Sequence, residues 1–68
     1  MLTPMQRYEW ATGPDGWLTV WGWERLADDL RYSAAVEASD WSAGMAQKYA
    51  DLAADCRRRA DSIRARAH

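Results

Sequence analysis

The chain of 68 residues is poor in the side chains that build metal sites and covalent cross-links. It holds one cysteine, Cys56, and one histidine, His68. A single cysteine excludes an internal disulfide, and a structural zinc site needs about four Cys or His ligands. We therefore expect no metal and no cofactor. A domain this small must then gain stability from bulky side chains, self-association or a partner.

Long apolar runs are also missing from the sequence. No stretch approaches the roughly 20 apolar residues of a membrane-spanning helix. Residues 1–5 lack both the basic start and the apolar run of a signal peptide. We expect a cytoplasmic protein with no membrane contact, and a single unpaired cysteine suits a reducing compartment.

Groups that would support catalysis are scarce as well. Carboxylates such as Asp28, Asp29, Asp51 and Asp55 fall on helix faces that the pattern predicts to be solvated, with no His or Lys in a matched position. A general base needs a pocket and a perturbed environment, and a short chain has little material to shape one. The sequence therefore favours a protein that is not an enzyme.

Tryptophan, by contrast, is abundant. Five are present, and four of them lie between Trp10 and Trp23. We expect most of the indoles to form the core, with Trp23 and Trp41 at the start of helix faces, and those beside the turn at 13–16 to be the exposed ones. The chain also has 13 Ala and 8 Arg but one Lys and no Asn, which is typical of GC-rich coding and suits a small phage or mobile-element protein.

Residues 6–21 are predicted to form a β-hairpin. Aromatic and β-branched residues favour strands, and the Gly-Pro-Asp-Gly run at 13–16 has turn chemistry. A short helix is the alternative, because Thr3 and Gln6 have the spacing of a capping box and Pro4 would occupy the first helical position. In that case the turn run would end the helix.

From Trp23 the apolar pattern becomes helical. Residues 23–38 are predicted to form one helix, with a buried face that includes Leu26 and Leu30 and an opposite face that leaves Tyr32 and Val36 in water. Residues 40–67 are predicted to form a long second helix, capped at Ser39-Asp40. Its apolar stripe consists of Trp41, Met45, Tyr49, Leu52, Ala53, Cys56, Ala60, Ile63 and Ala67.

The two predicted helices differ in length. At 1.5 Å per residue they would span about 24 Å and about 42 Å, so the longer one would overhang an antiparallel partner. Cys56, Ala60 and Ile63 would then need a further cover, from the hairpin or from a second chain. The predicted fold is a single domain over 1–68, mainly α (α+β): a Trp-rich β-hairpin, then an antiparallel helical hairpin. Three helices without a sheet is the alternative.

The expected function is non-catalytic protein binding, by a protein that inhibits or modulates a host protein, forms homo-oligomers or serves as a small subunit of an assembly. Aromatic side chains are over-represented at binding hot spots. The candidate partner-binding residues are Trp10, Trp17 and Trp21 on the hairpin, Tyr32 and Val36 on the first long helix, and Cys56 and Ile63 on the late stripe.

A nucleic-acid-binding protein is the alternative function. Residues 57–68 carry a net charge of +4 and residues 1–56 a net charge of −5. A basic end could neutralise phosphates, although positive charge at a helix C-terminus also suits the helix dipole and the acidic remainder would repel DNA. The candidate contacts are Arg57, Arg58, Arg59, Arg64 and Arg66.

Overall fold

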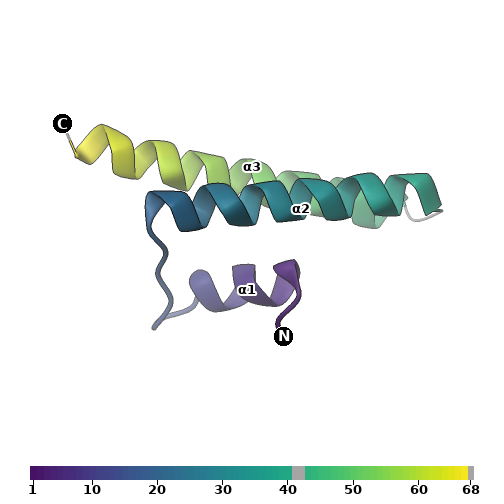
Figure 1. The fold of residues 1–68 in the computed structure, drawn as a ribbon, viewed down its shortest axis with the longest axis horizontal. Helices are drawn as coiled ribbons and strands as arrows, with labels where there is room; N and C mark the ends of the chain where they lie inside the picture. Colours follow the sequence, from purple (N-terminus) through teal and green to yellow (C-terminus); the bar gives the residue numbers. More distant parts are fainter. Residues whose placement is uncertain (41–42, 68) are drawn as a thin grey trace.

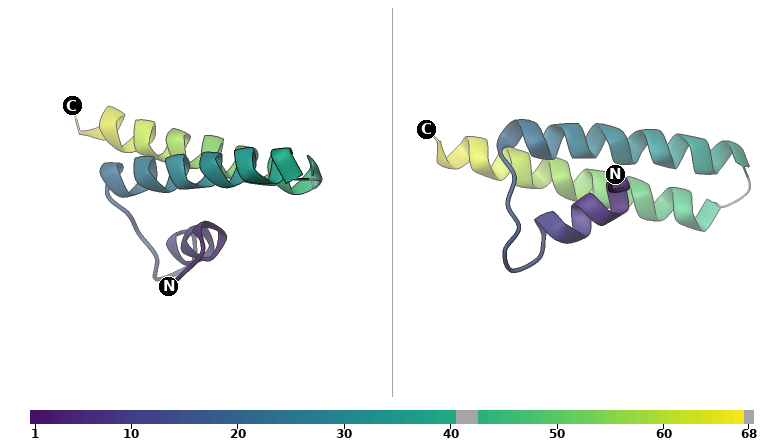
Figure 2. Two further views of the ribbon diagram at one scale, coloured as in Figure 1. Left: turned by 45° about the vertical axis from the view of Figure 1, so that its right-hand side comes forward. Right: turned by 60° about the horizontal axis from the view of Figure 1, so that its bottom comes forward.

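The computed structural model describes residues 1–40 and 43–67, and the side chains of all of these except 37–40. The described residues form three helices, α1 (Pro4–Ala11), α2 (Val20–Asp40) and α3 (Ala43–Arg66), and contain no strand. Helices α2 and α3 run antiparallel and side by side, and α1 lies beside the pair, mainly against α2 (Figure 1 and Figure 2). The antiparallel helical hairpin that the sequence predicted after the β-hairpin is therefore confirmed.

The predicted β-hairpin over 6–21 is wrong, and the short helix given as its alternative is what forms. The Oγ1 atom of Thr3 accepts a hydrogen bond from the backbone N–H of Gln6 at 3.1 Å, and the side chain of Gln6 accepts one from the N–H of Thr3 at 2.9 Å. Pro4 stands in the first turn. This reciprocal cap satisfies two backbone donors, whereas a lone two-stranded hairpin with no third strand is marginal in water.

The turn at 13–16 brings the chain back against the end of α1. The N–H of Gly16 donates to the carbonyl oxygen of Gly13 at 3.1 Å. A Cβ atom at position 16 would lie 1.8 Å from the carbonyl oxygen of Trp10. Only glycine allows this approach between the linker and the backbone of α1. Residues 13–16, which were predicted to form a β-hairpin turn, instead form the turn between α1 and the linker to α2.

Helix α2 begins three residues earlier than predicted. The Oγ1 atom of Thr19 accepts from the N–H of Gly22 at 3.1 Å, which is the geometry of a helix N-cap. Val20 and Trp21, expected in a strand, therefore belong to the first turn of α2. The predicted apolar face is confirmed by burial of four side chains, namely Trp23, Leu26, Ala27 and Leu30.

Helix α3 carries the predicted stripe in its middle. Ala53, Cys56 and Ala60 are buried, and Tyr49, Leu52 and Ile63 pack against them. Met45 and Ala67 are exposed, and Trp41 lies outside the described residues. The predicted cap and link at 38–40 are wrong, because α2 continues through Asp40.

The overhang is shorter than predicted, although the end of α3 still extends past the beginning of α2 (Figure 1). Helix α2 has 21 residues and α3 has 24, so the two nearly match. Cys56 is 0% and Ala60 1% exposed, with Ala11 of α1 and Trp23 of α2 in the same core cluster. The late stripe is therefore covered within a single chain, and the reason for expecting a second chain over Cys56 is removed.

Candidate contact surface

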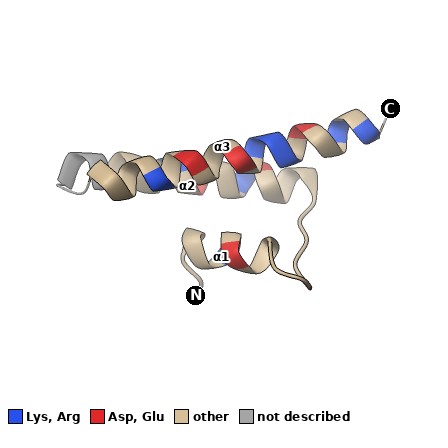
Figure 3. Ribbon diagram, turned by 180° about the vertical axis from the view of Figure 1, so that it is seen from behind, with Lys and Arg blue, Asp and Glu red and all other residues tan. Residues whose placement is uncertain are grey.

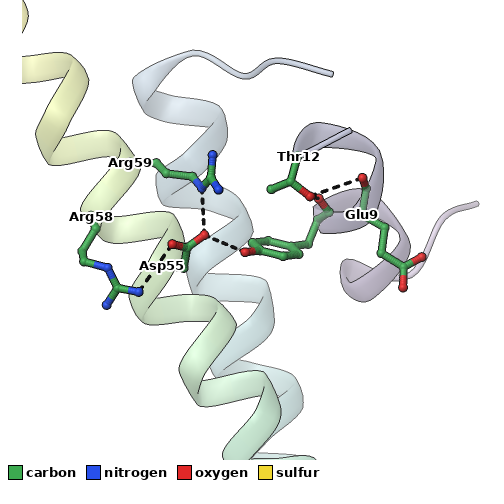
Figure 4. A network of polar contacts seen from close by, with 6 residues as sticks. Glu9, Thr12, Asp55, Arg58 and Arg59 are labelled. Atoms are coloured by element: carbon green, nitrogen blue, oxygen red, sulfur yellow. Dashed lines mark hydrogen bonds and ion pairs between the residues drawn. The ribbon is translucent and has the colours of Figure 1, made fainter. Parts of the chain in front are cut away.

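A cluster around Asp55 holds α1 in place against α3. The Oδ2 atom of Asp55 accepts hydrogen bonds from the hydroxyl of Tyr8 at 2.6 Å and from Nε of Arg59 at 2.7 Å (Figure 4). Its Oδ1 atom accepts from Nη2 of Arg58 at 3.4 Å. The guanidinium of Arg59 also lies 5.2 Å from the ring centroid of Trp23, within the range of a cation–π contact. One carboxylate thus links α1 to the core between α2 and α3.

Burial and hydrogen bonding shift the pKa values in this cluster. Burial raises the pKa of Tyr8, and the hydrogen bond to Asp55 raises it further. Burial alone would raise the pKa of Asp55, but the hydrogen bonds from Tyr8 and Arg59 outweigh it and hold that pKa below its usual value. The bond to Asp55 also raises the pKa of Arg59. The pair is therefore stabilised as neutral phenol and ionised carboxylate.

A second ionic contact fixes α1 on α2. Nη1 of Arg7 lies 2.5 Å from Oδ2 of Asp29, and Nε of Arg25 lies 3.4 Å from Oδ1 of the same carboxylate. Arg7 comes from α1 and Arg25 from α2, so the two cations face one anion where the helices meet. Their guanidinium groups border the opening described next.

A cleft of about 420 Å³ lies between α1 and the beginning of α2. The volume is within the range of small-ligand and side-chain pockets. Two arginines are the ionisable side chains of its lining, and the other lining residues are apolar or glycine. The cleft is lined by Leu2, Arg7, Trp10, Leu18, Gly22 and Arg25.

Three tryptophans that the core does not use lie at or near this cleft. Trp10, Trp17 and Trp21 are 52%, 68% and 77% exposed. Trp10 lines the cleft, and Trp17 precedes the lining residue Leu18 in the chain. Trp21 is one helical turn from the lining residue Arg25 and shares its face of α2. We call these three indoles and the cleft the α1–α2 surface.

Tyr32 and Val36 extend the exposed face along α2. Both are exposed, as predicted. Tyr32 follows Trp21 by 11 residues, which at 3.6 residues per turn returns it to the same side of the helix. Trp21, Tyr32 and Val36 therefore lie on one side of α2. The sequence analysis had treated Trp21 and the Tyr32–Val36 face as separate candidates.

The candidates on the late stripe are placed differently. Cys56 is fully buried, and its burial raises the pKa of the thiol to about 11. The contact role predicted for Cys56 does not fit this position. Ile63 is half-buried and packs against the core, and it does not line the cleft.

The basic end of α3 is matched by carboxylates of the same chain. Figure 3 shows Lys and Arg gathered in the later half of α3 with acidic residues close by. Arg57 lies 3.0 Å from Asp28, Arg58 and Arg59 contact Asp55, and Arg64 contacts Glu24 and Asp61. Arg66 is exposed near the end of the described part of the chain. Four of the five candidate phosphate contacts thus already face an anion.

The sequence did not single out most of the cleft lining, including Leu2, Arg7 and Leu18. Their positions follow from α1, so the hairpin interpretation concealed them. One signal was present: Arg25 and Asp29 have the i, i+4 spacing of a helical ion pair. Arg7 and Trp10 have i, i+3 spacing, which places two residues on one face of a helix. This signal was informative only if residues 4–11 were taken as helical.

Comparison with known proteins assigns no family to this arrangement. The chain matches no protein-family model, no curated protein and no solved structure. Within the described residues, no helix is long and apolar enough to cross a membrane. The same residues contain no group of three or more His, Cys, Asp or Glu side chains placed to hold a metal ion.

Proposed function

We propose that the chain is a non-catalytic protein-binding module that contacts its partner through the α1–α2 surface. The observation that carries the proposal is the placement of Trp10, Trp17 and Trp21. All three are more than half exposed, Trp10 lines the apolar cleft, and Trp17 and Trp21 are the chain neighbours of the lining residues Leu18 and Gly22. Tryptophan is the side chain most enriched at interface hot spots, because it buries a large area at small entropic cost.

The core is already complete without these indoles. Trp23 supplies the one fully packed indole among the described tryptophans, beside Leu26 and Leu30. No buried side-chain nitrogen or oxygen in the described residues lacks a hydrogen-bond partner. Exposed large apolar side chains beside an apolar cleft are typical of interaction surfaces.

The chemistry of the cleft supports binding over catalysis. Its ionisable lining consists of Arg7 and Arg25, and a guanidinium donates hydrogen bonds but accepts none. The thiol of Cys56 is the strongest candidate nucleophile by its chemistry, but it is buried and burial raises its pKa. A thiol held neutral in an apolar setting is a poor nucleophile.

Partner capture by surface variants tests this function. The immobilised full chain is compared with Trp10→Ala, Trp17→Ala and Trp21→Ala for retention of proteins from the producing cell. We expect a discrete partner that the unmodified chain retains and each variant releases, with a loss of affinity of about tenfold or more. Circular dichroism confirms that the variants keep their helices.

Met45→Ala is the matched control. Met45 is an exposed apolar side chain on α3 and does not line the cleft. Its removal should leave capture unchanged. Equal retention by all three tryptophan variants, or equal loss with Met45→Ala, would show that the α1–α2 surface is not the contact site.

A further inference from the structure

We propose that the α1–α2 cleft binds a peptide segment of the partner that places one large aliphatic side chain beside a carboxylate. The inference rests on the proposed function and adds the chemistry of the ligand. It follows from three properties of the lining: its apolar walls, the close packing of Leu18 on Gly22, and the unequal number of cations and anions at its rim.

The apolar walls select the aliphatic side chain. Leu2 and Trp10 are more than half exposed and Leu18 is partly so, so their faces in the cleft are wetted in the free protein. Covering them with a Leu- or Ile-sized group removes apolar area from water, which is favourable. The volume of about 420 Å³ accommodates one such side chain with part of its backbone.

Gly22 lets the side chain of Leu18 pack closely on the first turn of α2. A glycine inside a helix is less favourable than alanine, and here it stands in the first turn of α2 against Leu18. A Cβ atom at position 22 would approach Cβ of Leu18 to 3.1 Å. A larger side chain at this position would therefore push Leu18, which lines the cleft, out of its place.

The rim selects the carboxylate. Arg7 and Arg25 line the cleft and share the single carboxylate of Asp29, so two positive charges at the rim face one negative charge. Side-chain exposure is 77% for Arg25 and 35% for Arg7, which leaves guanidinium N–H groups of Arg25 facing solvent. An arginine in this state accepts an incoming carboxylate through charge-assisted hydrogen bonds.

Peptide titration of the full chain tests the proposal. Three blocked peptides are compared: Ser-Glu-Leu-Asp-Ser, its amide form Ser-Gln-Leu-Asn-Ser, and its truncated form Ser-Glu-Ala-Asp-Ser. The signal is the indole N–H resonance of Trp10 in a ¹⁵N-labelled protein, assigned by a Trp10→Phe variant. The buried indole of Trp23 serves as the internal reference.

We expect the acidic leucine peptide to move the Trp10 resonance saturably, and the amide and alanine peptides to bind about tenfold more weakly. Arg25→Gln should remove the preference for the acidic over the amide peptide. Gly22→Leu should abolish binding of all three by displacing Leu18 from the cleft lining. Arg66→Gln, an arginine on the far part of α3, should leave every titration unchanged.

Several results overturn the proposal. Equal binding of the acidic and amide peptides, or no movement of Trp10 by any peptide, removes the assigned ligand chemistry. If the tryptophan variants still abolish partner capture in that case, the proposed function survives alone; if they do not, both fail. A Trp10 shift that depends on protein concentration without peptide would place a second copy of the chain in the cleft and also overturn the proposal.

Discussion

The hydroxyl of Tyr8 donates a 2.6 Å hydrogen bond to Oδ2 of Asp55, which lies 47 residues later in the chain. Helix α1 packs mainly on α2, so this bond is a polar tie from α1 to α3. The carboxylate is charged and also accepts from Arg59. Hydrogen bonds to charged groups are stronger than neutral ones, and the position of the α1–α2 surface depends on this tie.

Tyr8→Phe should destabilise the fold by about 1 kcal/mol. The change removes the hydroxyl and leaves the ring in place, so Asp55 loses one donor without a change in packing. Urea unfolding followed by helical circular dichroism measures the difference. Tyr32→Phe is the control, because Tyr32 is 73% exposed. Equal midpoints for the two variants would show that the bond contributes nothing.

The same tie predicts a stability optimum between two pH limits. The folded-state pKa of Asp55 is lowered by its hydrogen bonds against the effect of burial, so its contribution is present above the unfolded pKa and is lost as pH falls through the folded one. The pKa of Tyr8 is raised, so its contribution is present below the unfolded pKa and is lost as pH rises through the folded one. We therefore expect losses below about pH 4 and above about pH 10.

A pH series of urea midpoints for the unmodified chain and for Tyr8→Phe separates this tie from general acid and alkaline unfolding. The difference between the two proteins should be largest near neutral pH and should shrink at both limits. Cys56 adds an alkaline loss of its own to both proteins, since burial raises its pKa to about 11. A difference that stays constant from acid to alkaline pH would contradict the assignment.

Cys56 should be inert toward thiol reagents while the chain is folded. The side chain is 0% exposed, and burial, followed by the charge of Asp55, raises its pKa. Reaction requires an exposed thiolate. We expect labelling by a disulfide reagent to be slow in buffer and to become rapid across the urea transition. Fast labelling in buffer would place the thiol on a surface and contradict its assignment to the core.

The basic end of α3 should not confer strong nucleic-acid binding. Arg57 and Arg59 face Asp28 and Asp55, so a phosphate must compete with a carboxylate already in place. Binding to single- or double-stranded DNA is measured at low and physiological salt. We expect weak binding. The triple variant Arg57/Arg58/Arg59→Ala should lower the free energy of unfolding and change the affinity for DNA little. Tight binding that falls steeply with salt and vanishes in the triple variant would establish the alternative function.

The sequence predicted the long helical hairpin well because burial leaves a periodic pattern there. The residues from Trp23 to Leu30 and from Ala53 to Ala60 repeat at helical spacing, and both faces are buried as expected. The exposure of Tyr32 followed from the same pattern. Helix ends were less predictable, since Thr19 caps α2 from within the segment read as a strand.

The first 21 residues were misjudged because local propensities conflict in that segment. Trp, Tyr and Thr favour strands, and the turn run at 13–16 suits a hairpin. The capping box of Thr3 and Gln6 is a short signal, yet it decides the structure because α1 can bury Ala11 and dock Tyr8 on the core. The cleft depends on that docking and on the shared carboxylate of Asp29, which is distant from Arg7 in sequence.

The central claim is that Trp10, Trp17 and Trp21 contact a different protein and not a second copy of this chain. The solution mass, measured by light scattering after size exclusion at low and high salt, tests it most directly. We predict a single species of 7.8 kDa at both salt concentrations, because one chain already covers Cys56 and the late stripe. A salt-resistant species of twice that mass, which Trp17→Ala and Trp21→Ala convert to monomer, would show that self-association occupies the indoles and would contradict the claim.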